Sequence, residues 1–208
     1  MININIFIFY PEVFKVKSKF ERKVSRIIKN LNNYNIYYLS DPNNFIECFF
    51  RNTAHKTALH KISDLNSNNI THAIIFDDGE EFVDNYQSFI NSPNINTRII
   101  NIDITRVVNI DKDTQYKSIK SSDTYQYIGR GSYWGNPYSM YDFSNDEDNS
   151  REDVIRKFKY DFDHNKFIKK EKDEVYKLVG KRLGCFCKPE ACHGDILADF
   201  LNSWDDGK

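Results

Sequence analysis

Apolar residues in the first half of the chain occur in short alternating or continuous runs, and longer stretches with helical spacing separate these runs. The runs predict strands at residues 2–9, 36–39, 73–76 and 98–102. The stretches between them predict helices at residues 17–31, 45–65 and 80–90. Strands that alternate with helices are typical of a parallel sheet, so we expect residues 1–103 to form a small Rossmann-like α/β domain.

The second half has a similar pattern with shorter strands. Apolar runs predict strands at residues 107–110, 125–128 and 183–187. Helices are predicted from Ser150, where Asp153 completes a capping-box-like start, at residues 174–179, where Gly180 suits a left-handed stop, and from Cys192-His193 onward. We therefore predict an α/β protein of two small parallel-sheet, Rossmann-like units packed together, over residues 1–103 and 105–208.

Composition and charge narrow the class of protein. The 208 residues carry 29 Lys and Arg against 30 Asp and Glu, and no long block has one sign, so we expect no nucleic-acid surface. The apolar residues 6–10 are too few to span a bilayer, and nothing resembles a signal peptide. With four cysteines, the chain is predicted to be cytoplasmic, in the host cytoplasm if phage-encoded, with reduced thiols. The sequence leaves open whether the protein forms a homo-oligomer.

Three of the four cysteines lie in nine residues near a predicted strand end and helix start, where backbone N–H groups favour anions and thiolates. We expect a ligand or catalytic site here. Buried apolar cysteines, transient redox pairing and zinc are the alternatives. Zinc is not favoured and no metal is assigned, because structural zinc sites usually bring two separated ligand pairs and adjacent residues project differently. The four candidate zinc ligands are Cys185, Cys187, Cys192 and His193.

A glycine-rich segment follows the predicted strand at residues 125–128. Glycines let a backbone approach a ligand closely, an arginine pairs with a carboxylate or phosphate, and an aromatic ring stacks on a base. The alternative is a structural turn in which Trp134 fills the core and Arg130 forms a surface pair. The predicted ligand-binding residues are Gly129, Arg130, Gly131, Ser132, Trp134 and Asn136.

The first domain shows less candidate chemistry. Tyr10-Pro11-Glu12 follows its first strand in place of a glycine-rich phosphate loop, which argues against ordinary dinucleotide binding. The Asp77-Asp78-Gly79 turn is interpreted mainly as a solvated acidic turn. Cys48, His55 and His60 are interpreted as packing and surface residues.

Two ungapped motifs in the second half resemble domain of unknown function 4326, a family of bacteria and phages with no established activity. The resemblance covers residues 105–208. Through Arg51-Asn52, the strand at residues 73–76 and Asp77-Asp78-Gly79, residues 1–103 more weakly resemble nucleotide-binding Rossmannoids of the SMF/DprA and LOG type, without their glycine-rich stretch. This resemblance implies that the ligand site is lost and that a scaffold or docking surface remains. The motifs that carry the first resemblance are Val107-Val108-Asn109, Tyr127 to Ser132 with Trp134 to Pro137, Arg151-Glu152, Gly184 to Cys187 and Cys192 to Asp195.

The leading functional hypothesis is that the protein binds a nucleotide or nucleobase-like small molecule between the glycine-rich loop and the cysteine-rich loop. It would act on this molecule there, by glycosidic-bond hydrolysis or base transfer. Phage nucleotide metabolism or counter-defence would fit this chemistry. Cys192 is the predicted thiolate or ligand donor, and His193 and Asp195 are the acid–base candidates. The alternatives are a non-catalytic nucleotide sensor and a zinc-bearing interaction module. The hypothesis requires the two loops to enclose one pocket.

Overall fold

The structure is a computed structural model that describes residues 4–52, 57–65, 70–81, 86, 89, 92–141, 150–167 and 170–207. The chain divides into two compact units: unit 1 is Met1–Ile102 together with Ser203–Lys208, and unit 2 is Asp103–Asn202. Across the described ranges, no helix combines the length and the apolar character needed to cross a membrane.

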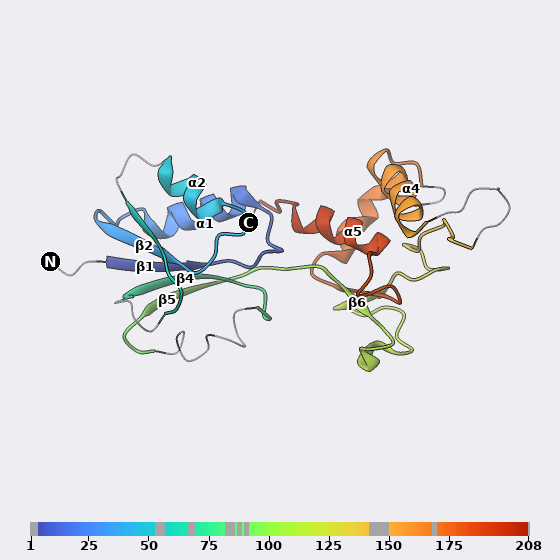
Figure 1. The fold of residues 1–208 in the computed structure, drawn as a ribbon, viewed down its shortest axis with the longest axis horizontal. Coiled ribbons are helices and arrows are strands. Elements are labelled where there is room, and N and C mark those ends of the chain that lie inside the picture. Colours follow the sequence, from blue (N-terminus) through green and yellow to red (C-terminus); the bar gives the residue numbers. More distant parts are fainter. Residues whose placement is uncertain are drawn as a thin grey trace. The chain divides into compact units, whose positions relative to one another are not determined.

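Unit 1 is built on a five-stranded sheet in which every pairing is parallel (Figure 1). The strand order β3-β2-β1-β4-β5 is that of a Rossmann-like sheet. This confirms the predicted α/β fold class with parallel sheets. The strands are β1 (Ile4–Phe9), β2 (Tyr34–Tyr38), β3 (Ala58–Lys61), β4 (His72–Asp77) and β5 (Asn96–Asn101).

Two helices cover one face of this sheet, α1 (Lys17–Ile28) and α2 (Phe45–Arg51) (Figure 1). In α1, the buried residues Phe20, Val24 and Ile28 recur every four positions and form the face that packs on the strands. The predicted helix over residues 45–65 was wrong, because α2 ends at Arg51 and the chain then adds β3 to the sheet edge. The helix predicted at residues 80–90 lies mostly outside the described residues.

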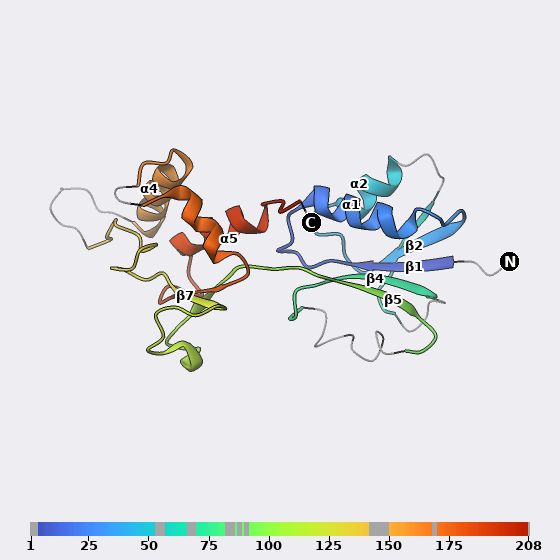
Figure 2. The same ribbon diagram turned by 180° about the vertical axis from the view of Figure 1, so that it is seen from behind.

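Unit 2 contains a three-stranded parallel sheet in the order β6-β8-β7, and its strands lie at the three predicted positions. These strands are β6 (Arg106–Asn109), β7 (Tyr125–Tyr127) and β8 (Arg182–Cys185) (Figure 2). Gly184 in the central strand cannot carry a side chain, because a Cβ there would lie 2.0 Å from the Tyr125 hydroxyl oxygen. Tyr125 is fully buried, so the glycine allows the tyrosine ring to pack against the strand.

The described part of unit 2 also contains four helical segments: η1 (Thr114–Tyr116), α4 (Arg151–Asp163), η2 (Lys172–Leu178) and α5 (His193–Asn202). The segment predicted as a helix at residues 174–179 is the 3₁₀ helix η2, and Gly180 after it has the predicted left-handed φ of 72°. Apolar residues of α4, η2 and α5 pack over β8 and form the core of the unit. The fully or almost fully buried members include Phe158, Phe162, Val175, Leu183 and Leu197.

Candidate functional site

The cysteine-rich loop begins where β8 ends and is fixed in place by Asn109 at the end of neighbouring β6. The Asn109 side-chain amide donates to the backbone carbonyls of Phe186, at 3.1 Å, and of Lys188. Its carbonyl oxygen accepts from the N–H groups of Asp111, at 2.9 Å, and Lys112, at 3.1 Å. One polar side chain therefore holds the turns that leave two adjacent strands.

Helix α5 begins immediately after Cys192, and Cys192 caps it. The Gly194 N–H donates to Cys192 Sγ at 3.4 Å, and the Asp195 carboxylate accepts from the Cys192 N–H at 2.9 Å. This reciprocal pattern resembles a capping box, with a thiol in place of the hydroxyl and with the N–H of the second helical residue as its donor. Asp195 also forms a 2.6 Å ion pair with Lys188. The carboxylate thus holds the helix start and the loop together and is not among the described residues that line the pocket, so its acid–base role stays a prediction.

Three buried side chains from the loop and from α5 form a compact cluster with a fourth beside them. Potential ligand atoms of Cys185, Cys192 and His193 all lie within 4.8 Å of one another. Cys192 Sγ lies 3.6 Å from His193 Nδ1, and Cys187 Sγ lies 3.5 Å from Cys185 Sγ. Cys185 and Cys192 are 4% and 1% exposed, and His193 is 5% exposed, so the cluster is almost closed to solvent. The four residues predicted as one constellation are therefore adjacent in space.

Hydrogen bonding and burial shift the pKa values of the residues in this cluster in different directions. A hydrogen bond from Cys192 lowers the pKa of Cys185, and the same interaction, together with burial, raises the pKa of Cys192. Burial lowers the pKa of His193, so its imidazole is neutral at pH 7. The thiol whose pKa is lowered is Cys185, whereas the sequence predicts Cys192 as the thiolate or ligand donor, and that role stays a prediction.

The glycine-rich loop leaves β7 on the other side of central β8. Tight turns fold it, with Ser132 N–H donating to Gly129 O and Gly135 N–H donating to Ser132 O, both at 3.1 Å. A Cβ at Gly135 would lie 2.6 Å from the Gly129 carbonyl oxygen, so the close approach of these two backbone segments requires a glycine. Gly131 has a φ of 81°, which also favours glycine.

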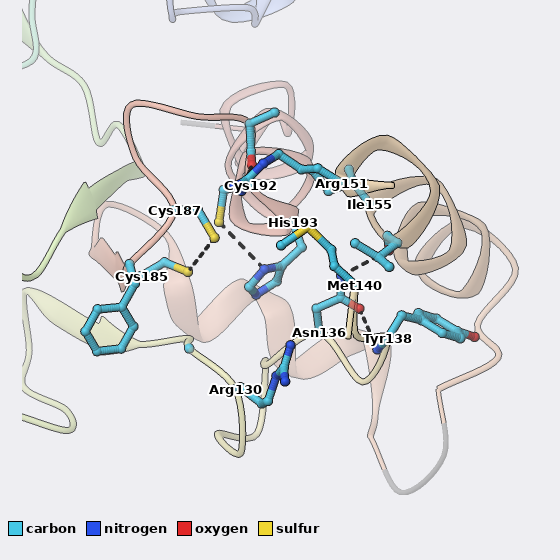
Figure 3. A pocket seen from close by; sticks show the side chains of 14 residues that line it. Arg130, Asn136, Tyr138, Met140, Arg151, Ile155, Cys185, Cys187, Cys192 and His193 are labelled. Atoms are coloured by element: carbon cyan, nitrogen blue, oxygen red, sulfur yellow. Dashed lines mark hydrogen bonds between the residues drawn. The ribbon is translucent and has the colours of Figure 1, made fainter. Parts of the chain in front are cut away.

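The two loops and the first turns of α4 enclose a pocket of about 230 Å³ (Figure 3). This places the two predicted loops against one cavity, as the functional hypothesis requires. Of the predicted site residues, Gly129, Arg130, Asn136, Cys192 and His193 line it. The remaining lining residues are Tyr138, Met140, Arg151, Val154, Ile155, Cys185, Phe186, Cys187 and Ala191.

Several predicted ligand-binding residues have structural tasks instead. Trp134 is 4% exposed and packs edge-on against Phe167 in the core, so its ring cannot stack on a ligand in the pocket. The Asn136 amide donates to Val154 O and its carbonyl oxygen accepts from Tyr138 N–H, both at 3.0 Å, which leaves it little capacity to recognise a ring. Gly131 and Ser132 belong to the loop but are not among the lining residues.

Arg151 is a site residue that sequence reasoning did not select. Ser150 and Asp153 form the predicted capping box at the start of α4, and this fixes Arg151 as the first helical residue. Its guanidinium donates to Ala191 O at 3.3 Å and lies on the opposite side of the pocket from Arg130 (Figure 3). The signal was present, because Arg151-Glu152 is part of the motif that carries the resemblance.

In unit 1, aromatic rings fill the region beyond the carboxyl ends of β1 and β4, where open α/β sheets bind ligands. The Tyr10 ring stacks on Phe45 at 5.2 Å, and Phe14 stacks on Phe76 at 5.2 Å. The Tyr10 hydroxyl donates to Asp41, whose carboxylate accepts from the first N–H groups of α2. An aspartate of the chain itself therefore takes the position at this helix start that a bound anion would occupy.

The Asp77-Asp78-Gly79 segment is a local turn, as predicted by its interpretation as a solvated acidic turn. Asp77 accepts from Gly79 N–H at 2.9 Å, and Asp78 accepts from the N–H groups of Glu80 at 3.0 Å and Glu81 at 3.1 Å. Cys48 and His60 lie on α2 and on edge strand β3, whereas His55 lies outside the described residues. His60 stacks on the Tyr37 ring at 4.8 Å, which fits a packing role.

Comparison with known proteins agrees with this division of the chain. Residues 3–108 match the minimal SLOG domain, and residues 108–203 match the domain of unknown function DUF4326. An uncharacterised 12.4 kDa protein of enterobacteria phage T4, from the nrdA-td intergenic region, is 42% identical over 76 residues; the match covers 36% of this chain and 65% of the phage protein. No solved structure matches significantly. The chain therefore belongs to the minimal SLOG domain family and carries a DUF4326 domain after its SLOG domain.

Proposed function

We propose that unit 2 binds a small anionic, nucleotide-like molecule in the pocket between the glycine-rich loop and the cysteine-rich loop. The observation that carries this proposal is the pair of arginines on opposite sides of one cavity, Arg130 from the first loop and Arg151 from α4. Two guanidinium groups from separate elements are suited to hold one phosphate or carboxylate from two directions.

Arg130 is exposed and forms no hydrogen bond or ion pair within the described ranges. Arg151 makes one long hydrogen bond to a carbonyl group, at 3.3 Å, so most of its donors are also open to a ligand. An anion that enters the pocket would therefore gain charge-assisted hydrogen bonds without first breaking an ion pair to either arginine in this part of the chain.

The remaining wall is largely apolar, which suits the flat face of a base or sugar. Met140, Val154 and Ile155 line it, and the Phe186 ring, 54% exposed, lies at its edge. A cavity of about 230 Å³ is smaller than the roughly 300–1,000 Å³ of most ligand pockets, which favours a ligand of mononucleotide size or smaller.

Family membership supports the nucleotide class, because the SLOG domain family suggests a nucleotide-related function. In this chain, the SLOG unit has aromatic side chains at its own switch-point crevice. We infer that unit 1 acts as a scaffold and that the ligand binds in unit 2.

Binding without catalysis, as in a nucleotide sensor, fits the pocket better than glycosidic-bond cleavage. Cleavage of that bond requires a carboxylate at the reacting centre. No Asp or Glu is among the described residues that line the pocket, and Asp195 is held in the cap of α5. The buried thiol of Cys192, with its raised pKa, is a weak nucleophile.

The test is a thermal-shift and calorimetric titration of the full chain with nucleoside monophosphates, ribose 5-phosphate, free nucleobases and inorganic phosphate. We expect a phosphate-bearing ligand to stabilise the protein. Arg130→Gln and Arg151→Gln should each weaken its binding by about 10- to 100-fold, because each removes a charged hydrogen bond of roughly 1.5–3 kcal/mol.

Arg156→Gln is the matched control. Arg156 lies on α4 with Arg151, but it is exposed and pairs with Asp153 at 2.7 Å away from the pocket lining. Its substitution should leave ligand affinity within about twofold, since surface ion pairs contribute little. Equal losses in all three variants, or stabilisation by none of the ligands, would contradict the proposal. Release of a free base during incubation would instead support the catalytic hypothesis.

A further inference from the structure

We propose that Cys185, Cys187, Cys192 and His193 form a zinc site with three thiolate ligands and one imidazole ligand. It would connect the end of β8 to the start of α5 in the wall of the pocket. This proposal concerns the wall of the pocket and does not depend on which ligand the pocket takes.

Two of the distances among the four side chains already fit a tetrahedral ion, and the Cys187 sulfur, which is not among the ligand atoms that lie within 4.8 Å of one another, would have to move closer to Cys192 and His193 on binding. Zinc binds sulfur at about 2.3 Å and nitrogen at about 2.0–2.1 Å, so neighbouring ligand atoms lie roughly 3.5–3.8 Å apart. Cys192 Sγ and His193 Nδ1 are separated by 3.6 Å, and Cys185 Sγ and Cys187 Sγ by 3.5 Å. Two opposite edges of the coordination tetrahedron are thus already present.

The imidazole has the orientation and tautomer that a metal ligand needs. His193 Nε2 lies 3.0 Å from the carbonyl oxygen of Ile128, and because a carbonyl only accepts, Nε2 carries the proton. Nδ1 then keeps a lone pair that is directed at the cysteines (Figure 3). Metal-binding histidines commonly donate their second nitrogen to a backbone carbonyl in this way.

The fold removes the objection that adjacent residues project in different directions. Cys192 is the capping residue before α5, and His193 is the first residue of the helix. The chain direction changes between them, so both side chains turn toward Cys185. The loop over residues 186–191 reverses the chain and returns Cys192 to the strand end. One short segment can therefore supply all four ligands.

The donor set and its surroundings favour zinc among the common metals. Three thiolates and one imidazole in tetrahedral arrangement are a zinc set, and four protein ligands leave no open position, as in structural sites. The three thiols release their protons to solvent on binding, and the site then carries a net charge of −1. The Gly194 N–H on Cys192 Sγ and the guanidinium of Arg151 in the same pocket wall offset that charge.

The first experiment measures metal content of the full chain, purified under reducing conditions without a metal-affinity step. Elemental analysis should find about one zinc per chain. Cobalt(II) added to chelator-treated protein should give the absorption bands of a tetrahedral thiolate complex. The proposal would be overturned if the protein held no zinc, even after incubation with zinc chloride, and if cobalt(II) gave no such bands.

Substitutions then assign the ligands. Cys185→Ser, Cys192→Ser and His193→Ala should remove bound zinc. Cys187→Ser changes a less buried position and should keep the fold while weakening zinc binding by more than about tenfold. Cys48→Ser, which changes the remaining cysteine on α2 of unit 1, is the matched control and should keep zinc at the wild-type level. Zinc retained equally in all four variants of the cluster would overturn the assignment.

The arginine variants separate this proposal from the proposed function. Arg130→Gln and Arg151→Gln should keep zinc while losing affinity for the pocket ligand. If zinc is absent but a nucleotide still binds, only the zinc proposal fails. If zinc is present but no ligand of the panel binds, only the proposed function fails.

Discussion

The Tyr10 hydroxyl occupies the place in unit 1 where related α/β sheets leave room for a ligand. It donates to Asp41 and accepts from Asn43 N–H at 3.0 Å, and burial together with Asp41 raises the pKa of Tyr10. Tyr10→Phe should destabilise the protein by about 1–3 kcal/mol in urea denaturation, because the Asn43 N–H and the Asp41 carboxylate lose a partner. Tyr37→Phe is the control.

Tyr37 is a suitable control because its ring packs on His60 and its hydroxyl has no hydrogen bond to another described residue. Its substitution should change stability by less than about 0.5 kcal/mol. If both variants unfold at the same urea concentration, the hydroxyl of Tyr10 does not stabilise the closed crevice.

Single residues show where sequence reasoning ends. Arg130 and Trp134 lie four positions apart in one glycine-rich loop, and both were predicted to touch a ligand. The structure turns Arg130 to the pocket and buries Trp134 among Phe167 and other core side chains. A sequence gives the residue types but not which side of an irregular turn each one faces, since no period relates their directions.

At the level of elements, α4 brings three side chains to the pocket wall, and its start depends on the Ser150 cap. Ser150 Oγ accepts from Asp153 N–H at 3.1 Å, and the Asp153 carboxylate accepts in return from Ser150 N–H. Ser150→Ala should lower the free energy of unfolding by about 1 kcal/mol and weaken ligand binding slightly, because the first turn that holds Arg151 frays. Denaturant titration and calorimetry measure the two effects.

Ser25→Ala on α1 is the comparison variant for this test. Ser25 is exposed in the middle of a helix, where alanine is the better helix former, so the change should be neutral or slightly stabilising. A loss of stability at Ser25 equal to that at Ser150 would show that capping is not the cause.

Elements with a buried face were predictable, and exposed ones were not. β1 and β4 are each buried over four consecutive residues, three of them apolar in β1 and all four in β4, and a run of this kind is typical of a central parallel strand. β3, with the sequence Ala-Leu-His-Lys, is mostly exposed and was read as the end of a helix, because an edge strand has no required apolar face. Its pairing with β2 is a tertiary contact that local sequence does not encode.

On the scale of the whole molecule, residues 203–207 return to α1 of unit 1 through a charged clasp. Both terminal nitrogens of the Arg22 guanidinium donate to the Asp205 carboxylate, at 3.0 and 3.1 Å, and Ser18 donates to it at 2.5 Å. Lys19 pairs with Asp206 at 3.0 Å. The hydrogen bonds from Arg22 and then Ser18 hold the pKa of Asp205 well below its usual range.

Asp205→Asn should lower the midpoint of thermal unfolding at pH 7. The folded pKa of Asp205 is lower than the unfolded one, so the stabilisation is complete above about pH 4 and is lost as pH falls through the folded value. The difference between wild type and variant should therefore shrink in thermal scans between pH 5 and pH 2. Asp123→Asn, at an exposed side chain without a partner in the described ranges, should show no such pH dependence. A difference that stays constant with pH would contradict this origin.

The clasp also has a consequence for how the gene can be altered. The polypeptide leaves unit 1 after Ile102 and rejoins it at Ser203, so the pocket-bearing half is nested inside the SLOG half. A single cut after Ile102 would leave the C-terminal segment of unit 1 attached to unit 2. A frameshift after codon 202 would leave every pocket residue unchanged, but it would replace the residues of the clasp. It would therefore destabilise unit 1, although unit 1 is the part of the chain that the ribosome synthesises first.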